Sequence, residues 1–193
     1  MEQNTKKRRS KTALKKTLLT LMKHKPFSKI TIKELCLEAG LNRSTFYANY
    51  EDIHALLKDI HTDMFHEMSR FLQDSSGFSD GQNSAVHWMR QTYNERVRTV
   101  TAIIYYLKNN MDMFSMLLNN NSDNLFEKHL TDYYIRLYCM ENVEFTKKYS
   151  FLYHTIGSFS LIHQWIRDDC PFTPEKLAEL ICIQSQNVDI FND

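Results

Sequence analysis

Only 4 glycines and 3 prolines occur in this chain of 193 residues, and their scarcity constrains the fold more than any other feature. Gly and Pro mark tight turns and interrupt helices, so a chain built from many short strands needs more of them. The apolar fraction of 42% is that of a folded globular protein. The sequence therefore predicts an all-α fold of about nine helices joined by short polar loops.

Apolar periodicity places these helices along the chain. Ser10 or Thr12 is expected to cap the first helix, and Asp52 is expected to begin the helix of residues 51–73. Thr173-Pro174-Glu175 opens the last helix with a cap and a proline at the first helical position. The segment 83–110 fits one long helix or two that break near Arg96. The expected helices cover residues 11–25, 31–39, 43–49, 51–73, 83–110, 111–118, 124–139, 147–167 and the stretch from 173 onward.

Residues 31–50 carry the local signals of a helix-turn-helix. Thr31 and Glu34 form a capping box, in which each side chain accepts a hydrogen bond from the backbone amide of the other. Gly40 supplies the left-handed residue that ends this helix, and Asn42 caps a further helix that starts at Arg43. With the helix of residues 11–25 before them, these elements predict a three-helix DNA-binding unit.

Charge is segregated along the chain, although the net charge is only +1. Residues 1–50 contain 12 Lys and Arg against 3 Asp and Glu, whereas residues 51–193 contain 12 against 20. A basic end attracts a polyanion, while the acidic remainder is repelled by it. This pattern favours nucleic acid as a partner, bound by the N-terminal end.

The segment from Thr31 to Tyr50 strongly resembles the helix-turn-helix of the TetR family of transcriptional regulators. The resemblance rests on the capping-box opening, on Ala39-Gly40-Leu41 and on Arg43-Ser44-Thr45-Phe46-Tyr47, and it covers residues 11–60 closely. Weaker similarity continues at residues 109–114 and 165–177. It implies a DNA-binding domain over residues 1–55, with a basic N-terminal arm, and a ligand-binding and dimerisation domain over residues 56–193.

Major-groove geometry assigns roles on the helix from Arg43, because only its N-terminal, groove-facing side chains reach base edges. Phe46 and Tyr50 are expected to point inward, and Arg43 is the candidate for bidentate recognition of guanine. Tyr47 and Asn49 are expected to donate to phosphates, and the arm of residues 6–9 to follow the backbone or enter a minor groove. The full set of DNA-binding candidates is Lys6, Lys7, Arg8, Arg9, Thr31, Lys33, Asn42, Arg43, Ser44, Thr45, Tyr47 and Asn49.

Two positions depart from the family's pattern. Asn49 stands where the family commonly has His, and Ile53 stands where it commonly has Lys, both of which usually contact phosphates. Asn can replace the His contact, but Ile53 brings no charge and the nearby Glu51 repels a phosphate. Two functions therefore stay open: a ligand-relieved repressor that binds a palindromic operator as a dimer, and a co-activator or adaptor that acts mainly through a protein partner.

Methionine and aromatic side chains interleave through the middle of the chain, where the resemblance implies a small-molecule pocket. Met and Tyr suit an adaptable apolar site with a few polar groups, and no cluster of Arg or Lys favours a phosphate there. We expect a small apolar or aromatic ligand. The candidate lining residues are Met64, Phe65, Met68, Trp88, Met89, Tyr93, Tyr105, Phe114, Tyr134 and Tyr138.

The last two predicted helices have apolar side chains on more sides than one chain needs to bury. Gly157 and Ser158 permit close backbone approach, so a two-fold interface of four helices is predicted, as the resemblance also implies. The candidate interface residues are Phe151, Leu152, Ile156, Gly157, Phe159, Ile162, Ile166, Leu177, Leu180, Ile181 and Val188.

The sequence has no signature of an enzyme, a cofactor or a metal site. GxSxG, a Gly-rich phosphate loop and HExxH are absent, and the four cysteines form no CxxC pair. His54 and His61 share a helical stripe near Asp63 and His66, but their spacing does not gather three ligands, so we expect surface histidines. No apolar run reaches the roughly 20 residues that span a bilayer, and a cytoplasmic protein without a membrane partner is expected.

Overall fold

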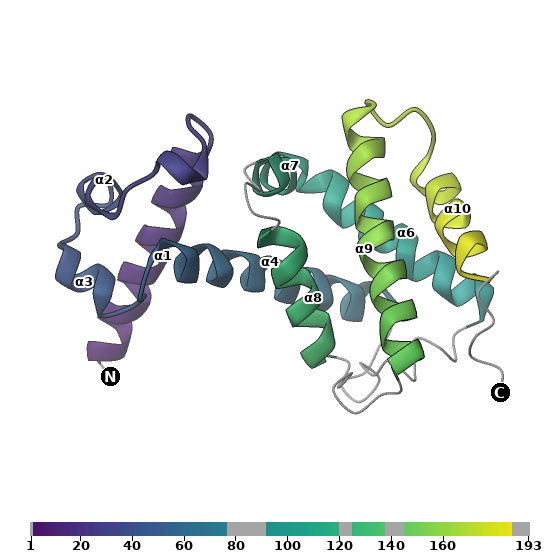
Figure 1. The fold of residues 1–193 in the computed structure, drawn as a ribbon, viewed down its shortest axis with the longest axis horizontal. Helices are drawn as coiled ribbons and strands as arrows, with labels where there is room; N and C mark the ends of the chain where they lie inside the picture. The colour runs from purple at the N-terminus through teal and green to yellow at the C-terminus, as the bar shows by residue number, and fades with distance from the viewer. Residues whose placement is uncertain (1, 77–91, 120–124, 138–144, 187–193) are drawn as a thin grey trace. The chain divides into compact units, whose positions relative to one another are not determined.

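The structure is a computed structural model that describes residues 2–76, 92–119, 125–137 and 145–186. These residues form α-helices and one 3-10 turn, without a strand among them, so the all-α prediction is confirmed (Figure 1). The elements are α1 (Glu2–Met22), η1 (Phe27–Lys29), α2 (Ile32–Glu38), α3 (Arg43–Tyr47), α4 (Ile53–Ser76), α6 (Tyr93–Asn109), α7 (Met111–Asn119), α8 (Leu125–Leu137), α9 (Phe145–Arg167) and α10 (Pro174–Gln186).

The chain divides into two compact units. The first unit contains Met1–Met64 and Asp112–Phe126, and the second contains Phe65–Met111 and Glu127–Asp193. Helix α4 therefore contributes its first part to one unit and its remainder to the other. The units are defined by packing alone, so the functional boundary near residue 55 stays a prediction.

Helix α1 begins earlier than the sequence predicted. It starts at Glu2 and includes the basic arm of residues 6–9, because the segment has no Gly or Pro and is rich in good helix formers. Ser10 and Thr12 do not cap it: their hydroxyls donate to the carbonyls of Lys7 (2.9 Å) and Arg8 (3.1 Å) inside the helix. The predicted cap and the separate arm are both wrong.

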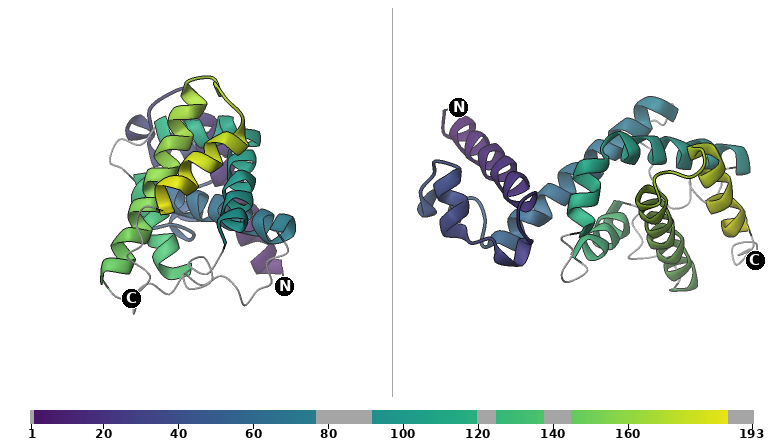
Figure 2. Two further views of the ribbon diagram at one scale, coloured as in Figure 1. Left: turned by 90° about the vertical axis from the view of Figure 1, so that its right-hand side faces the viewer. Right: turned by 90° about the horizontal axis from the view of Figure 1, so that it is seen from above.

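Helices α1, α2 and α3 pack on one another around a small apolar core (Figures 1 and 2). Leu14, Leu18, Leu35 and Phe46 are completely buried there. Gly40 has a φ of +63° and ends α2 as predicted, with the amide of the next residue donating to the Cys36 carbonyl (2.9 Å).

The capping box of α2 forms only in part. The Thr31 hydroxyl accepts from the Glu34 amide (3.3 Å), as expected for the N-cap. The Glu34 carboxylate, however, forms an ion pair with Lys25. A cation from the preceding turn has replaced the backbone amide as its partner.

Helix α4 is capped by Asp52, which accepts from the Ala55 amide (2.7 Å) as predicted. Its apolar stripe in the first unit includes His61, which is 1% exposed and lies edge-on to the Phe126 ring at 5.3 Å between centroids. The prediction of a surface histidine is wrong here, because residue 61 follows Leu57 and precedes Met64 on the inward face. Among the residues described, no group of His, Cys, Asp and Glu could hold a metal ion.

The second unit is built on α6, α9 and α10. Helix α6 begins at Tyr93 with a complete capping box between Thr92 and Glu95. The sequence left two alternatives open for residues 83–110, one long helix or two with a break near Arg96, and residues 83–91 lie outside the described part of the chain. Helix α10 packs against α6 and α9 and starts as predicted, with Pro174 at the first position and the Thr173 hydroxyl accepting from the Lys176 amide (3.4 Å).

Candidate nucleic-acid interface

The side chains of α3 divide into a buried set and an exposed set. Phe46 is 0% exposed and Tyr50 follows it into the core, with 6.0 Å between their ring centroids. Arg43 and Ser44 are exposed and Tyr47 is 58% exposed. The inward orientation of Phe46 and Tyr50 is therefore as predicted, and a basic, a hydroxyl and a phenol group are left on the outer face of α3.

Asn42 and Asn49 flank this helix in different ways. Asn42 occupies the N-cap position, but its exposed side chain makes no capping hydrogen bond. Asn49 donates from its amide nitrogen to the Thr45 carbonyl (2.7 Å) and to the Ser10 hydroxyl (3.3 Å). Because an amide nitrogen has two hydrogens, both are used inside the protein, and Asn49 joins the end of α3 to α1.

A basic surface lies along α1. An open hollow of about 820 Å³ is lined by Lys7, Arg8, Lys11, Thr12, Lys15, Lys16 and Leu19 of α1 and by Asp63 of α4. Lys7, Arg8 and Lys16 are exposed, as are Lys6 and Arg9 earlier in the helix. These cations add a fixed helical array of positive charge to the same compact unit that carries α3.

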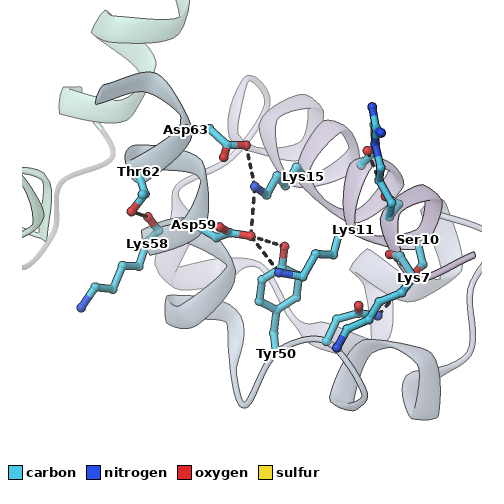
Figure 3. Close-up of polar contacts among 12 residues, drawn as sticks. Lys7, Ser10, Lys11, Lys15, Tyr50, Lys58, Asp59, Thr62 and Asp63 are labelled. Carbon is cyan, nitrogen blue, oxygen red and sulfur yellow. Dashed lines mark hydrogen bonds and ion pairs between the residues drawn. The ribbon is translucent and has the colours of Figure 1, made fainter. Parts of the chain in front are cut away.

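Asp59 of α4 holds a polar cluster between α1 and α4 (Figure 3). Its carboxylate accepts a hydrogen bond from the Tyr50 phenol (2.7 Å) and ion pairs from Lys15 (2.9 Å) and Lys11 (3.4 Å). Lys15 also pairs with Asp63 (2.5 Å), and the Lys11 ammonium lies 4.9 Å from the centre of the Tyr50 ring. We call Lys11, Lys15, Tyr50, Asp59 and Asp63 the Asp59 cluster.

Burial and charge oppose each other within the Asp59 cluster. Burial alone would raise the pKa of Asp59, but the hydrogen bonds from Tyr50 and Lys15 and the positive charges of Lys15 and Lys11 outweigh it, so the pKa is lowered. Burial, followed by the hydrogen bond to Asp59, raises the pKa of Tyr50 well above its usual range. Tyr50 therefore stays a neutral donor and Asp59 an ionised acceptor near neutral pH.

The Asp59 cluster was not predicted from the sequence. The available signal was a matched spacing: Lys11 and Lys15 are four residues apart on one helix, as Asp59 and Asp63 are on another.

Residues 51 and 53, at the start of α4, include the position that departs from the pattern of the TetR family. Ile53 is half-buried and Glu51 is exposed, so neither adds a cation to this surface.

The predicted pocket residues that the structure describes are distributed over the two units. Met64 and Phe114 are buried in the first unit, where Phe114 packs on Phe126, whereas Met68 is buried in the second. Tyr105 is exposed and its hydroxyl donates to the Glu175 carboxylate (2.7 Å), so its assignment to a pocket is wrong. Tyr105 comes directly after the buried Ile104 and therefore lies on the outer face of α6. Phe65 and Tyr93 lie in the second unit, and Trp88, Met89, Tyr138 and the side chain of Tyr134 lie outside the described residues.

The predicted interface residues are mostly core residues of the second unit. Leu152, Ile156 and Gly157 are half-buried, Leu180 is exposed and Val188 lies outside the described residues. A different apolar stripe is exposed on α9: Phe145, Tyr149, Tyr153 (74% exposed) and Leu161, four or eight residues apart, with Gly157 in register between the last two. The candidates buried within the chain are Phe151, Phe159, Ile162, Ile166, Leu177 and Ile181.

Comparison with known protein sequences gives two consistent matches. Residues 97–187 match a TetR-type family model described as a transcriptional regulator C-terminal region. The chain is 23% identical over 175 residues to YxbF of Bacillus subtilis (strain 168), an uncharacterized HTH-type transcriptional regulator, covering 87% of the chain. The chain spans only 42% of the length of that relative.

Two solved structures have a similar fold. A TetR transcriptional regulator from Streptococcus agalactiae 2603V superposes with a TM-score of 0.64 at 22% identity, over 96% of this chain and 98% of the other. A protein from Syntrophomonas wolfei str. Goettingen assigned to the TetR family gives a TM-score of 0.61 at 14% identity, over 95% and 96%. Within the described part of the chain, no helix has the length and apolar character needed to cross a membrane.

Proposed function

This chain belongs to the TetR family of transcriptional regulators, and from that membership we propose that it binds duplex DNA sequence-specifically as a homodimer. The observation that carries the proposal is the division of α3, where Phe46 and Tyr50 anchor the helix while Arg43, Ser44 and Tyr47 are exposed. An exposed helix of this kind fits the major groove, where Arg43 would read guanine and the hydroxyl groups would contact phosphates or bases.

The basic surface of α1 supports phosphate binding beside the recognition helix. Lys6, Lys7, Arg8 and Arg9 are exposed on one helix rather than on a loose arm, so we propose that they track the DNA backbone. Thr31 and Lys33, exposed at the start of α2, are proposed to hold a further phosphate. These contacts would set position, and α3 would set sequence preference.

The exposed stripe of α9 supports dimerisation through this helix and α10. Gly157 lies between Tyr153 and Leu161 on the stripe, and a Cβ built on Gly157 meets no atom within 4 Å. A glycine inside a helix costs about 1 kcal/mol relative to alanine, and close approach of a second copy would explain its place. Leu180 and Ile183 give α10 an exposed apolar surface of its own.

Repression relieved by a small ligand is the regulatory mode that we propose. A ligand changes DNA affinity only by binding two arrangements of the dimer unequally. The alternative, a co-activator or adaptor that acts through a protein partner, is favoured by Ile53 and Glu51 and by the amide of Asn49, whose hydrogens are already used. Arg43, Tyr47 and the cations of α1 favour direct DNA binding.

Selection of DNA from a random-duplex pool, followed by sequencing, tests the proposal. A dimeric binder should enrich two inverted half-sites about one helical turn apart. The selected duplex should then bind the full chain with submicromolar affinity, and Arg43→Ala should weaken it. Failure to enrich any sequence at low salt would contradict direct, specific DNA binding and favour the adaptor function.

A further inference from the structure

Several buried polar side-chain atoms in the second unit lack a hydrogen-bond partner in the part of the chain that the structure describes. They include Nε of Arg96 on α6 and Oγ of Ser150 and Nε2 of His154 on α9. Buried polar atoms in native proteins are nearly always paired, so three such atoms in one unit point to a bound group.

Helix geometry and charge bring these groups toward one place. Ser150 and His154 are four residues apart and therefore share a face of α9. The charge of Arg96 acts on both His154 and the Cys182 thiol, so the guanidinium lies within electrostatic reach of α9 and α10. Val100, one turn after Arg96 on α6, and Cys182 are both buried and apolar.

The chemistry of the three groups is that of an anion site. A guanidinium offers a planar fork of donors that matches a carboxylate, and a hydroxyl offers one more. Burial, followed by the charge of Arg96, lowers the pKa of His154, so the imidazole is neutral near pH 7 and offers one N–H. One positive charge with two neutral donors matches a single negative charge.

No acidic residue in the described ranges forms an ion pair with Arg96. The ion pairs of Lys11, Lys15 and Lys25 with carboxylates all lie within the first unit. A half-buried guanidinium without an internal counter-ion is costly, and an external anion would supply the missing charge.

We propose that Arg96, Ser150 and His154 form a binding site for the carboxylate of a small organic acid whose apolar part packs near Val100 and Cys182. This site refines the expectation of a purely apolar ligand, because one arginine and two neutral donors select a monoanion over a neutral molecule. Inorganic phosphate, which becomes doubly charged as pH rises above about 7, fits this charge less well and has no apolar part. The site does not depend on DNA binding, and its test does not use DNA.

Thermal unfolding and calorimetric titration of the full chain test this proposal. Benzoate and hexanoate are the probes, benzamide and hexanamide are their neutral counterparts, and inorganic phosphate is the competing anion. The carboxylates should raise the unfolding temperature by a few degrees at millimolar concentration, whereas the amides and phosphate should not. Arg96→Gln should weaken carboxylate binding at least ~10-fold, as expected when a charge-assisted pair is removed.

Arg98→Gln is the matched control, because Arg98 is exposed on the same helix and should leave binding unchanged. Ser150→Ala, a smaller change, keeps the test informative if Arg96→Gln does not fold, and it should weaken carboxylate binding while sparing the fold. The proposal is overturned if neither carboxylate stabilises the protein, if acid and amide act equally, or if phosphate binds more tightly than the carboxylates. It is also overturned if Arg96→Gln binds benzoate like the parent. Where Arg96→Gln does not fold, the same result for Ser150→Ala overturns it.

Discussion

The Tyr50 phenol donates a 2.7 Å hydrogen bond to the carboxylate of Asp59, and this contact joins the segment that follows α3 to the second turn of α4. Lys15 of α1 binds the same carboxylate, so three segments of the first unit meet at one side chain. Tyr50 also packs on Phe46 of α3. The orientation of α3 is therefore linked to α1 and α4 through a single acceptor.

Tyr50→Phe should destabilise the first unit without creating a cavity in its core. The ring is kept, but the ionised Asp59 loses a donor, and hydrogen bonds to charged groups contribute about 1.5–3 kcal/mol. We expect a loss toward the lower end of that range, because Lys15 remains. Urea unfolding measures it, and Tyr47→Phe, which removes a phenol from the exposed face of α3, should change stability by less than about 0.5 kcal/mol. Equal losses in the two variants would contradict the role of the Tyr50–Asp59 bond.

The lowered pKa of Asp59 predicts how stability changes in acid. The folded state holds the pKa below the ordinary carboxyl value of 3.8, so the unfolded chain binds a proton first as pH falls. The stabilisation is complete above that value and is lost progressively as pH falls through the folded pKa. Asp59→Asn should therefore flatten the dependence of the unfolding free energy on pH below about 4. Glu38→Gln, on the exposed side of α2, is the control and should keep the slope of the parent.

Arg43→Ala should cost about 1–3 kcal/mol of DNA binding and relax sequence preference at one base position in each half-site. Lys7→Ala and Arg8→Ala should instead weaken binding to all sequences alike. For each phosphate contact that is lost, the slope of log K against log salt concentration should become smaller by about one. Fluorescence anisotropy with the selected duplex and with a scrambled one, at several salt concentrations, separates the two effects. A uniform loss for Arg43→Ala would mean that this residue contacts the backbone.

Asn49 is expected to act on DNA by positioning α3, because both hydrogens of its amide are used inside the protein. Asn49→Ala should lower stability and DNA affinity together. Ser10→Ala removes the hydroxyl that accepts from the Asn49 amide, on α1 and away from the proposed major-groove contacts, and should reproduce part of both losses. Anisotropy and urea unfolding of the two variants give the comparison. A loss of affinity in Asn49→Ala alone, with a smaller salt slope, would show a direct phosphate contact instead.

Local signals in the sequence predicted most of the first unit. Thr31, Gly40, Asp52 and Phe46 act within one or two turns of chain, and the structure uses them as expected at the cap, turn, helix start and core. The Asp59 cluster was missed because it joins residues up to 48 apart, and a matched spacing does not by itself say which two helices will pack.

Periodicity was less informative in the second unit, because it marks apolar faces without saying what covers them. Helix α9 has two such faces: Phe159 and Ile162 lie in the core of the chain, whereas Tyr149 and Tyr153 are exposed. Hydropathy ranks the buried face higher, so the sequence assigned it to the dimer. His61 is the converse case, a polar residue placed on an apolar stripe by its position alone.

Gly157→Arg should prevent dimerisation without unfolding the protomer. A Cβ at Gly157 meets no atom within 4 Å beyond its chain neighbours and the backbone of its own helix, so the arginine has room in the protomer. It would, however, place a charge in the middle of the exposed stripe of α9. Light scattering after size-exclusion chromatography should show a monomer of about the chain mass of 23.0 kDa. Helical content by circular dichroism should match the parent, and DNA affinity should fall because two half-sites can no longer be bound together.

Asn109→Arg is the control for this change, because it adds the same side chain to an exposed position at the end of α6. It should remain a dimer and keep its DNA affinity. Tyr153→Glu, one turn before Gly157 on the same stripe, should reproduce the monomer with a charge of opposite sign, which separates burial of the stripe from simple electrostatic attraction. A stable dimer in both Gly157→Arg and Tyr153→Glu would mean that the second copy binds elsewhere, and the exposed aromatic stripe would then need another partner.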